Sequence, residues 1–479
     1  MNFEFNNFEL KNLFLILALI VCAGNLSAQT YTYTDEDEWR AYDDFNRVFL
    51  DTKNSKYIYR DHSARATAVD RWNGAAAIWC QAIFYDMAVN AYRRAVQEDN
   101  ATRKTKYKTV AQRIYSGEKK QYCNFDFDNN NTNTGWFVYD DIMWWTCALA
   151  RAHEAFGGST TSHPYRSEAE RSFLRVWYGS PKVGDDGSYA DPARGLGGGM
   201  FWEWQPIDKP KAHKAGDFRS ACINFPTVIA ACLLHKIVPE GRAEPATTGR
   251  PSQQTKEWYL EKAKEVFEWA DNTLVSNGRV ADGIHGGGPE FKDHLYNQAT
   301  YIGACCHLYL LTGEETYLAK ANRAANYVFN TMCSSYYLPL ETGVEQGIYA
   351  AIFAQYISML VYDCGQTRYA SYIRRNIQRA WTNRDQKRGI HNANFRSGST
   401  KETDQVESYN ASGMPALMLM FPVGEATGIE ELPPLDEPRD EASAIYTIDG
   451  KSVLNQCHAG QSALRPGLYV TNHRKILVR

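Results

Sequence analysis

Apolar residues recur at three- and four-residue spacing through most of the chain between residues 70 and 421. This spacing places apolar side chains on one face of a helix and therefore predicts amphipathic helices. Strand-like alternation of apolar and polar residues is rare before residue 440. The predicted helical stretches are 70–98, 136–156, 165–178, 217–236, 254–275, 293–311, 315–333, 345–363 and 404–420.

One junction between two of these helices indicates how they are connected. The run from Leu311 to Glu315 ends one helix at a glycine and starts the next with acidic residues, as helix ends prefer. This predicts an antiparallel hairpin of 293–311 with 315–333. About a dozen helices joined in this way predict an all-α fold, an (α/α)6 barrel, since no repeat of fixed length supports a solenoid. Loops rich in Gly and aromatic residues separate other helices, at 179–204, 278–290 and 385–402.

The N-terminus departs from the helical pattern. Lys11 precedes an apolar run at 13–21 and a small-residue site that ends at Ala28. This layout predicts a signal peptide at 1–28, and export to the periplasm, the cell surface or the exterior. Cys22 leaves attachment of a lipid open.

The C-terminus also differs in composition from the rest. A helical domain at 29–421 is followed by a stretch rich in Pro and acidic residues, which predicts a linker at 422–441. Short runs of β-branched and aromatic residues then predict a small β module at 442–479.

Composition says more about which ligands the protein could bind than about its fold. The formal net charge is -3 and no long run of Lys or Arg occurs, which argues against nucleic acid. The 12 Trp and 30 Tyr residues suit the faces of sugar rings, although any large core also uses such residues. None of the 11 cysteines forms a Cys-x-x-Cys pair, and no His/Cys group has zinc-ligand spacing. We therefore expect no metal site and no cofactor.

The most distinctive segment for chemistry runs from Gly135 to Trp145, where Asp140 and Asp141 are neighbours among aromatic residues. An acidic pair at the start of a helix is common, because Asp favours the N-cap and the first turn. Two ionised carboxylates among large aromatic side chains are nevertheless costly unless a site uses them. The aromatic neighbours that we expect to contact a ligand are Trp136, Tyr139, Trp144 and Trp145.

Glycoside hydrolysis is a reaction that uses two such carboxyls. A retaining glycosidase needs one carboxylate as nucleophile and one carboxylic acid as proton donor, about 5 Å apart. Successive residues of a helix diverge by about 100°, which can hold two carboxyls on opposite sides of a scissile bond. A helix N-terminus favours the ionised form, whereas burial favours the protonated form. On this basis we expect Asp140 to be the nucleophile and Asp141 the acid/base.

Loops elsewhere add candidates for substrate binding. In the Gly-rich run that ends at Trp202, Gly198 and Gly199 would let the backbone approach a ligand, although a flexible loop is the plainer interpretation. Asp282 lies in another Gly-rich loop, where its carboxylate could accept sugar hydroxyls or form only an Asp-Gly turn. A second acidic pair at 185–187 has a turn-like context that predicts a solvated loop.

Together these segments resemble glycoside hydrolase family 76, the endo-α-1,6-mannanases. The acidic pair and its aromatic neighbours resemble the family's Tyr-Asp-Asp-x-x-Trp-Trp signature, and the loop ending at Trp202 resembles its Gly-Gly-Gly-x-x-Trp element. The resemblance implies an (α/α)6 barrel, a retaining mechanism without a metal, and the matching residues as substrate contacts. The further matches, in order along the chain, are Asn224, Asp282, Tyr296, Asn297 and Gln298.

Two departures from the family pattern concern substrate contacts. Residues 218–221 stand where the family has a Lys-Asn element, and 345–348 (Glu-Gln-Gly-Ile) stand where it has Lys-Gly-Ile or Lys-Gly-Phe. At the C-terminus, the layout IYTIDGK…LRPGLYV…KILV resembles the sorting modules of the type IX secretion route, which implies a role in export.

The leading hypothesis is a secreted, monomeric, retaining endo-glycosidase that hydrolyses α-1,6-linked mannan of the yeast or fungal type. A transglycosylase acting on mannan would use the same residues and differ only in the access of water. A non-catalytic glycan-binding barrel is disfavoured by the acid pair. A sugar isomerase or epimerase on a similar barrel is disfavoured by the lack of a His cluster in the sequence.

Overall fold

A computed structural model of the chain describes residues 31–129, 131, 136, 138–202, 210–246 and 249–423. It also describes the backbone of four strands between residues 445 and 478. The predicted signal peptide at 1–28 lies outside the described residues, as does all but the start of the predicted linker at 422–441. Export and the linker therefore stay predictions.

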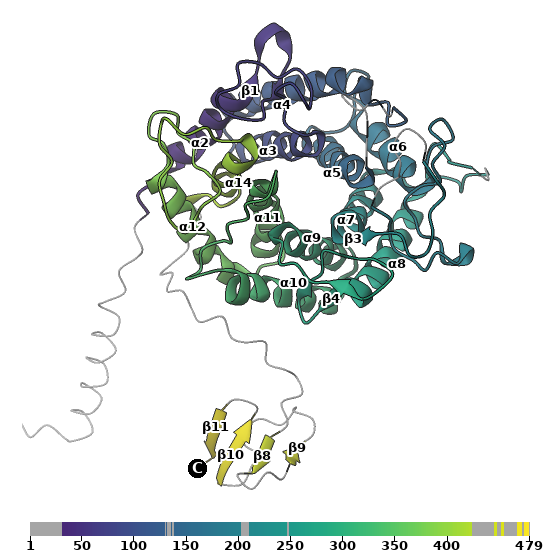
Figure 1. The fold of residues 1–479 in the computed structure, drawn as a ribbon, viewed down its shortest axis with the longest axis vertical. Coiled ribbons are helices and arrows are strands. Elements are labelled where there is room, and N and C mark those ends of the chain that lie inside the picture. The colour runs from purple at the N-terminus through teal and green to yellow at the C-terminus, as the bar shows by residue number, and fades with distance from the viewer. Residues whose placement is uncertain are drawn as a thin grey trace, which may run out of the picture. The chain divides into compact units, whose positions relative to one another are not determined.

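The described helices form two concentric rings (Figure 1). Each inner helix contacts the next inner helix along the chain, and the last contacts the first, so that the inner ring closes. This arrangement, drawn from the described residues, confirms the predicted (α/α)6 barrel. The inner helices are α3 (Ile78–Gln97), α5 (Tyr139–Ala155), α7 (Ala221–Ile237), α9 (Leu295–Thr312), α11 (Tyr349–Ser358) and α14 (Gly413–Met420). The outer helices are α2 (Asp35–Phe49), α4 (Ala101–Gln121), α6 (Tyr165–Tyr178), α8 (Lys256–Leu274), α10 (Glu315–Tyr327) and α12 (Ala370–Asn383).

All inner helices run in the same direction, because the chain alternates between the inner and the outer ring. Residues at or just before the starts of α3, α5, α7, α9 and α11 line one cavity. Residues near the ends of all the inner helices line a second cavity, at the other end of the barrel. The helix N-termini and the helix C-termini are thus gathered at opposite ends.

The hydrophobic pattern located most of these helices. The predicted helix at 165–178 coincides with α6, and the predicted hairpin is formed by α9 and α10. The prediction of a helix over 70–98 is wrong in its first turns, because α3 begins only at Ile78. Asp70 instead accepts the N–H group of Trp72 (2.9 Å), which folds this segment into a turn. No helix within the described ranges is both long and apolar enough to span a membrane.

Short antiparallel strands join some of the loops between helices. They contribute backbone hydrogen bonds where a loop must be held at the end of the barrel. The paired elements are β1 (Leu50–Asp51) with β2 (Ile58–Tyr59), β4 (Val275–Ser276) with β5 (Arg279–Val280), and β6 (Gly283–Ile284) with both β3 (Arg219–Ser220) and β7 (Pro289–Glu290).

The C-terminal residues form a separate unit, 433–479. Its strands make an antiparallel sheet in the order β11-β10-β8-β9, which agrees with the small β module expected from the sequence. A role of this module in sorting stays a prediction. The strands are β8 (Ile445–Thr447), β9 (Ser452–Leu454), β10 (Gly467–Thr471) and β11 (Arg474–Val478).

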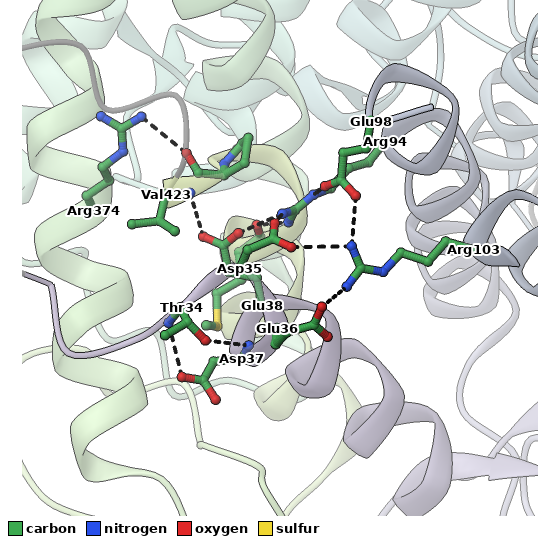
Figure 2. Close-up of polar contacts among 12 residues, drawn as sticks. Thr34, Asp35, Glu36, Asp37, Glu38, Arg94, Glu98, Arg103, Arg374 and Val423 are labelled. Carbon is green, nitrogen blue, oxygen red and sulfur yellow. Dashed lines mark hydrogen bonds and ion pairs between the residues drawn. The ribbon is translucent and has the colours of Figure 1, made fainter. Parts of the chain in front are cut away.

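A buried ion cluster joins the two ends of the helical domain where the ring closes (Figure 2). Arg94 on α3 is only 4% exposed, and its guanidinium binds the buried Glu38 of α2 (2.7 Å). Glu38 also accepts the N–H group of Val423, just after α14 (2.9 Å). Asp35 and Glu98 bind the same guanidinium. One cluster therefore ties α2, α3 and the end of α14 together.

Replacing Arg94 with Met should lower the free energy of unfolding by about 3 kcal/mol, because it leaves the buried Glu38 carboxylate without its partner. Arg47, also on α2, pairs with Asp44 at 2.7 Å but is 55% exposed, so Arg47→Met should cost under about 1 kcal/mol. Denaturant unfolding of the two variants measures the difference. Equal losses would contradict the role of the cluster in closing the ring.

Candidate active site

The predicted acid pair lies in a cleft of about 610 Å³ at the end of the barrel where the inner helices begin. Helix N-termini carry partial positive charge, so this end of the barrel favours negative groups. The residues that line the cleft are Arg71, Trp72, Trp79, Val138, Asp140, Asp141, Trp144, Trp202, Phe218, Ser220, Cys222, Asp282, Tyr296, Val344, Glu345 and Tyr349.

Asp140 and Asp141 are the second and third residues of α5. The N-cap position is occupied by Val138, whose side chain makes no capping hydrogen bond. The N–H group of Tyr139 donates to the carbonyl of Trp202 (3.2 Å), so a neighbouring loop caps the helix with its backbone. Neither acid is the N-cap residue, and both line the cleft.

The two carboxyls differ in their electrostatic surroundings. Burial raises the pKa of Asp140 to about 7, while hydrogen bonds from Cys222, Trp202 and first-turn N–H groups act to lower this pKa. Burial, followed by the charge of Asp140, raises the pKa of Asp141 well above its ordinary value, against the effect of Arg71. The donors around Asp140 therefore favour its carboxylate, whereas the charge of Asp140 favours the protonated form of Asp141.

Three of the aromatic residues predicted to contact substrate line the cleft: Trp144, Trp202 and Tyr296. Tyr296 stacks on Tyr349, with ring centroids 4.0 Å apart. Trp202 packs edge-on against Phe218, with centroids 5.8 Å apart. These rings give the cleft apolar walls, which suit the faces of a sugar.

Trp136 and Trp145 lie in the core instead of the cleft. Both are fully buried, and the ring of Trp136 packs against Phe127 (4.7 Å between centroids). The Trp145 indole donates to the carbonyl of Ile78 (2.9 Å). Because neighbouring helix positions point about 100° apart, Trp144 can face the cleft while Trp145 faces the core. Trp136 and Trp145 were expected to contact a ligand, but their side chains instead pack in the core next to the start of α5.

Tyr139 is buried as well, and its hydroxyl donates to Asp185 (2.9 Å). The Asp185 carboxylate is paired with the buried guanidinium of Arg175 on α6 (2.6 Å). The prediction that the 185–187 pair belongs to a solvated loop is therefore wrong for Asp185, because Arg175 supplies a buried counter-charge. Tyr139 uses this pair to anchor the start of α5 and does not line the cleft.

Gly198 and Gly199 pack on an outer helix and do not line the cleft. Both have left-handed backbone angles, with φ values of 87° and 77°. A Cβ atom on Gly198 or Gly199 would lie 2.6 or 2.3 Å from the ring of Trp269 on α8. The glycines therefore allow a close approach, as expected, but the approach is to Trp269 and not to a ligand.

Asn224 holds the same loop from the inner side. Its Oδ1 accepts the N–H group of Met200 (2.9 Å), and its Nδ2 donates to the carbonyl of Met200 (3.1 Å) and to that of Ser220 (2.8 Å). The side chain is fully buried, so these backbone groups are its partners in place of a ligand. Asn224 thereby fixes the segment that carries Trp202 to the cleft.

Asp282 lines the cleft and has two side-chain partners. Asn297 Nδ2 on α9 donates to one carboxylate oxygen (3.2 Å), and Lys292 Nζ donates to the other (3.3 Å). The carbonyl of Asp282 also accepts the N–H group of Ala221, the first residue of α7 (2.9 Å). Asp282 thus combines a cleft position with a structural role in capping α7.

Asn297 and Gln298 are buried and act on the loop before α9. The amide of Gln298 is oriented to donate to the carbonyl of Gly278 (2.8 Å) and to accept the N–H group of Val280 (2.9 Å). These contacts hold the turn that precedes Asp282. Neither residue lines the cleft; Asn297 holds the Asp282 side chain and Gln298 holds the backbone before it.

Several cleft residues were not singled out from the sequence. Trp72 is 66% exposed and Val344 is 84% exposed, and together they add apolar surface to the lining. Trp72 could have been recognised from its polar neighbours in the turn that starts at Asp70, because a large aromatic side chain in a polar turn is more often exposed for binding than buried in the core. Within the part of the chain that the structure describes, no group of three or more His, Cys, Asp or Glu side chains is arranged to hold a metal. The other cleft residues missed are Arg71, Trp79, Val138, Phe218, Ser220, Cys222, Glu345 and Tyr349.

Two carboxyls in one aromatic-lined cleft at the end of an (α/α)6 barrel fit what acid-assisted cleavage of a glycosidic bond requires, so the fold and the site are consistent with a glycoside hydrolase. The sequence profile of Glycosyl hydrolase family 76 matches residues 48–423, and the chain belongs to this family. No curated protein sequence matches the chain.

Solved structures resemble the helical domain. The Lin0763 protein from Listeria innocua is 20% identical with a TM-score of 0.61, over 81% of this chain and 96% of that one. The GH76A α-1,6-mannanase from Salegentibacter sp. HEL1_6 is 21% identical with a TM-score of 0.59, over 81% and 97%. An inactive variant of that mannanase in complex with α-1,6-mannotriose, in which two adjacent aspartates are replaced by asparagine, is 19% identical with a TM-score of 0.58, again over 81% and 97%. At these identities the resemblance establishes the fold.

Gly199→Ala should lower the free energy of unfolding by about 2 kcal/mol or more and reduce activity, because the added methyl group displaces the loop that carries Trp202. Gly195→Ala is a matched control: its φ of 73° imposes the same backbone strain, but no atom lies within 4 Å of the added Cβ. We expect it to cost about 1 kcal/mol. Thermal unfolding and intrinsic Trp fluorescence measure both effects. Identical behaviour of the two variants would rule out packing on Trp269 as the cause.

Proposed function

We propose that this chain hydrolyses α-1,6-linked mannan within the polymer, with retention of the anomeric configuration. The observation that carries the proposal is the acid pair at the start of α5: both carboxyls line one cleft, with hydrogen-bond donors near Asp140 and the charge of Asp140 beside Asp141. A retaining glycosidase requires two such carboxyls, since one group must attack while the other donates.

In the proposed first step, the Asp140 carboxylate attacks the anomeric carbon while Asp141 donates its proton to the departing glycosidic oxygen. This gives a mannosyl ester of Asp140, and it leaves Asp141 ionised. In the second step, Asp141 takes a proton from a water molecule, which attacks the same carbon and releases Asp140. Each step inverts the anomeric centre, so the product retains the configuration of the substrate.

Support for the substrate comes from the composition of the cleft and from the related structures. The lining offers aromatic faces together with the carboxylate of Asp282, which suits a neutral hexose. The Salegentibacter enzyme is named as an α-1,6-mannanase, and its variant with two altered adjacent aspartates was captured with α-1,6-mannotriose. We also propose that residues 1–28 direct export, so that the enzyme meets its polysaccharide outside the cytoplasm.

Asp140→Asn and Asp141→Asn should each lower the rate of release of short oligosaccharides from linear α-1,6-mannan by about 10³-fold or more. Chromatography of the products measures the rate. Asp186→Asn is the control: it alters one acid of another adjacent pair, outside the cleft lining, and should leave the rate within about twofold. A wild-type rate in either Asp140→Asn or Asp141→Asn would contradict the proposal.

Azide should rescue the two alanine variants with opposite stereochemistry on an α-mannoside that has a good leaving group. In Asp140→Ala, azide takes the place of the missing nucleophile and yields the β-mannosyl azide. In Asp141→Ala, azide attacks the ester on Asp140 and yields the α-mannosyl azide. Proton NMR of the products distinguishes the two. Exchanged anomers would reverse the assignment of the two aspartates.

A further inference from the structure

A third carboxylate in the cleft, that of Glu345, has no part in the proposed mechanism. It immediately precedes the short 3₁₀ turn Gln346–Ile348 that leads into α11, and it lines the cleft together with Asp140 and Asp141. Asp282, the remaining acid of the lining, is bound by Asn297 and Lys292. The position of the Glu345 carboxylate in the cleft therefore calls for a physical reason of its own.

The backbone of Glu345 adopts a conformation that side chains rarely accept. Its φ of 66° and ψ of -5° lie in the left-handed region, where a residue with a Cβ is strained. Such strain persists only where the surroundings impose it, and it gathers at functional sites. The side chain is held at one oxygen: the indole of Trp79 donates to Oε2 (2.7 Å).

Trp79 connects this carboxylate to the catalytic helix. Trp79 is the second residue of α3, and its ring packs against that of Trp144, with centroids 6.4 Å apart. Trp144 lies one helical turn after Asp141, on the same face of α5. The strained turn, the Trp79 anchor and the acid pair therefore form one contiguous wall of the cleft.

The groups that face Asp141 come from several elements. Asp140 on the same helix and Glu345 before α11 raise the pKa of Asp141, after the larger effect of burial, and Arg71 before α3 lowers it. The thiol of Cys80 on α3 and the phenol of Tyr122 after α4 also lie near Asp141. Among the described residues, the charges of Glu345 and Arg71 thus act on Asp141 from outside α5, and they act in opposite directions.

We propose that Glu345 is a positioning residue for the acid/base step: anchored by Trp79, its negative charge keeps the catalytic proton on Asp141, and Arg71 limits this effect. The inference rests on the proposed function. It applies to both steps, because a neighbouring negative charge makes Asp141 a stronger base when it must take a proton from water. A glycine at this position would relieve the strain but remove the charge.

Carbon-13 NMR of carboxyl-labelled aspartate follows the titration of Asp141 without any substrate, with its signal assigned from the spectrum of Asp141→Asn. In Glu345→Gln the midpoint should fall by about one pH unit, because a negative neighbour is lost. In Arg71→Gln it should rise. Glu290→Gln, which neutralises an acid outside the cleft lining, should leave the midpoint unchanged. A midpoint in Glu345→Gln equal to that of the wild type would overturn the inference.

The pH dependence of kcat/KM provides the functional readout. Loss of the proton from Asp141 sets the alkaline limb, so this limb should move to lower pH in Glu345→Gln and return in Glu345→Asp. Glu345→Gly removes the charge and the strain together, so it should show the same shift with no loss of thermal stability. If the pH profiles of wild type and Glu345→Gln coincide while Asp141→Asn is inactive, the role of Glu345 is rejected and the proposed function is not. Full activity in Asp141→Asn would instead reject the proposed function.

Discussion

The shared direction of the inner helices is the constraint on which the rest of the described structure depends. Because each inner helix starts at the same end of the barrel, the loops before them converge on one cleft. The opposite end gathers the helix C-termini together with cationic side chains such as Arg151 and Lys236. Helix dipoles thus favour carboxylates at one end and cations at the other. The arrangement requires a closed ring, and Glu38 of α2 links its first and last helices, because it binds Arg94 of α3 and accepts the N–H group of Val423 after α14.

Two neighbouring residues acquire different chemistry because a helix turns between them. Asp140 meets hydrogen-bond donors from two elements, Cys222 at the start of α7 and Trp202 in the loop that caps α5, which favour the ionised form. Asp141 is 5% exposed and meets the charges of Asp140 and Glu345, which favour the protonated form. The same separation explains why the aromatic residues divide between the cleft and the core. The glycosidase chemistry therefore follows from where α5 begins and from which loops cap it.

The periodic pattern was sufficient to predict the barrel and most inner helices, because inner helices are apolar. It missed α2, α4 and α12, outer helices that are polar on average, although α2 and α12 each have a distinct apolar face and Thr34 and Asp37 form a capping box at the start of α2. Within the site, motif residues such as Asn224 proved to be supports for the loops, because residue type does not reveal which way a side chain faces. Trp72 and Glu345 are far apart in the sequence, and only the closed ring brings both to the cleft lining.

The measurement that tests the account most directly is the identification of the residue that bonds to the sugar. A fluorinated mannosyl fluoride, which forms the glycosyl ester faster than water removes it, should add one mannosyl group to the intact protein. Peptide mapping by mass spectrometry should then locate that group on Asp140, because hydrogen-bond donors around this carboxyl favour its ionised, nucleophilic form against the effect of burial. A label on Asp141, or a protein that turns over the substrate without a covalent adduct, would contradict the account.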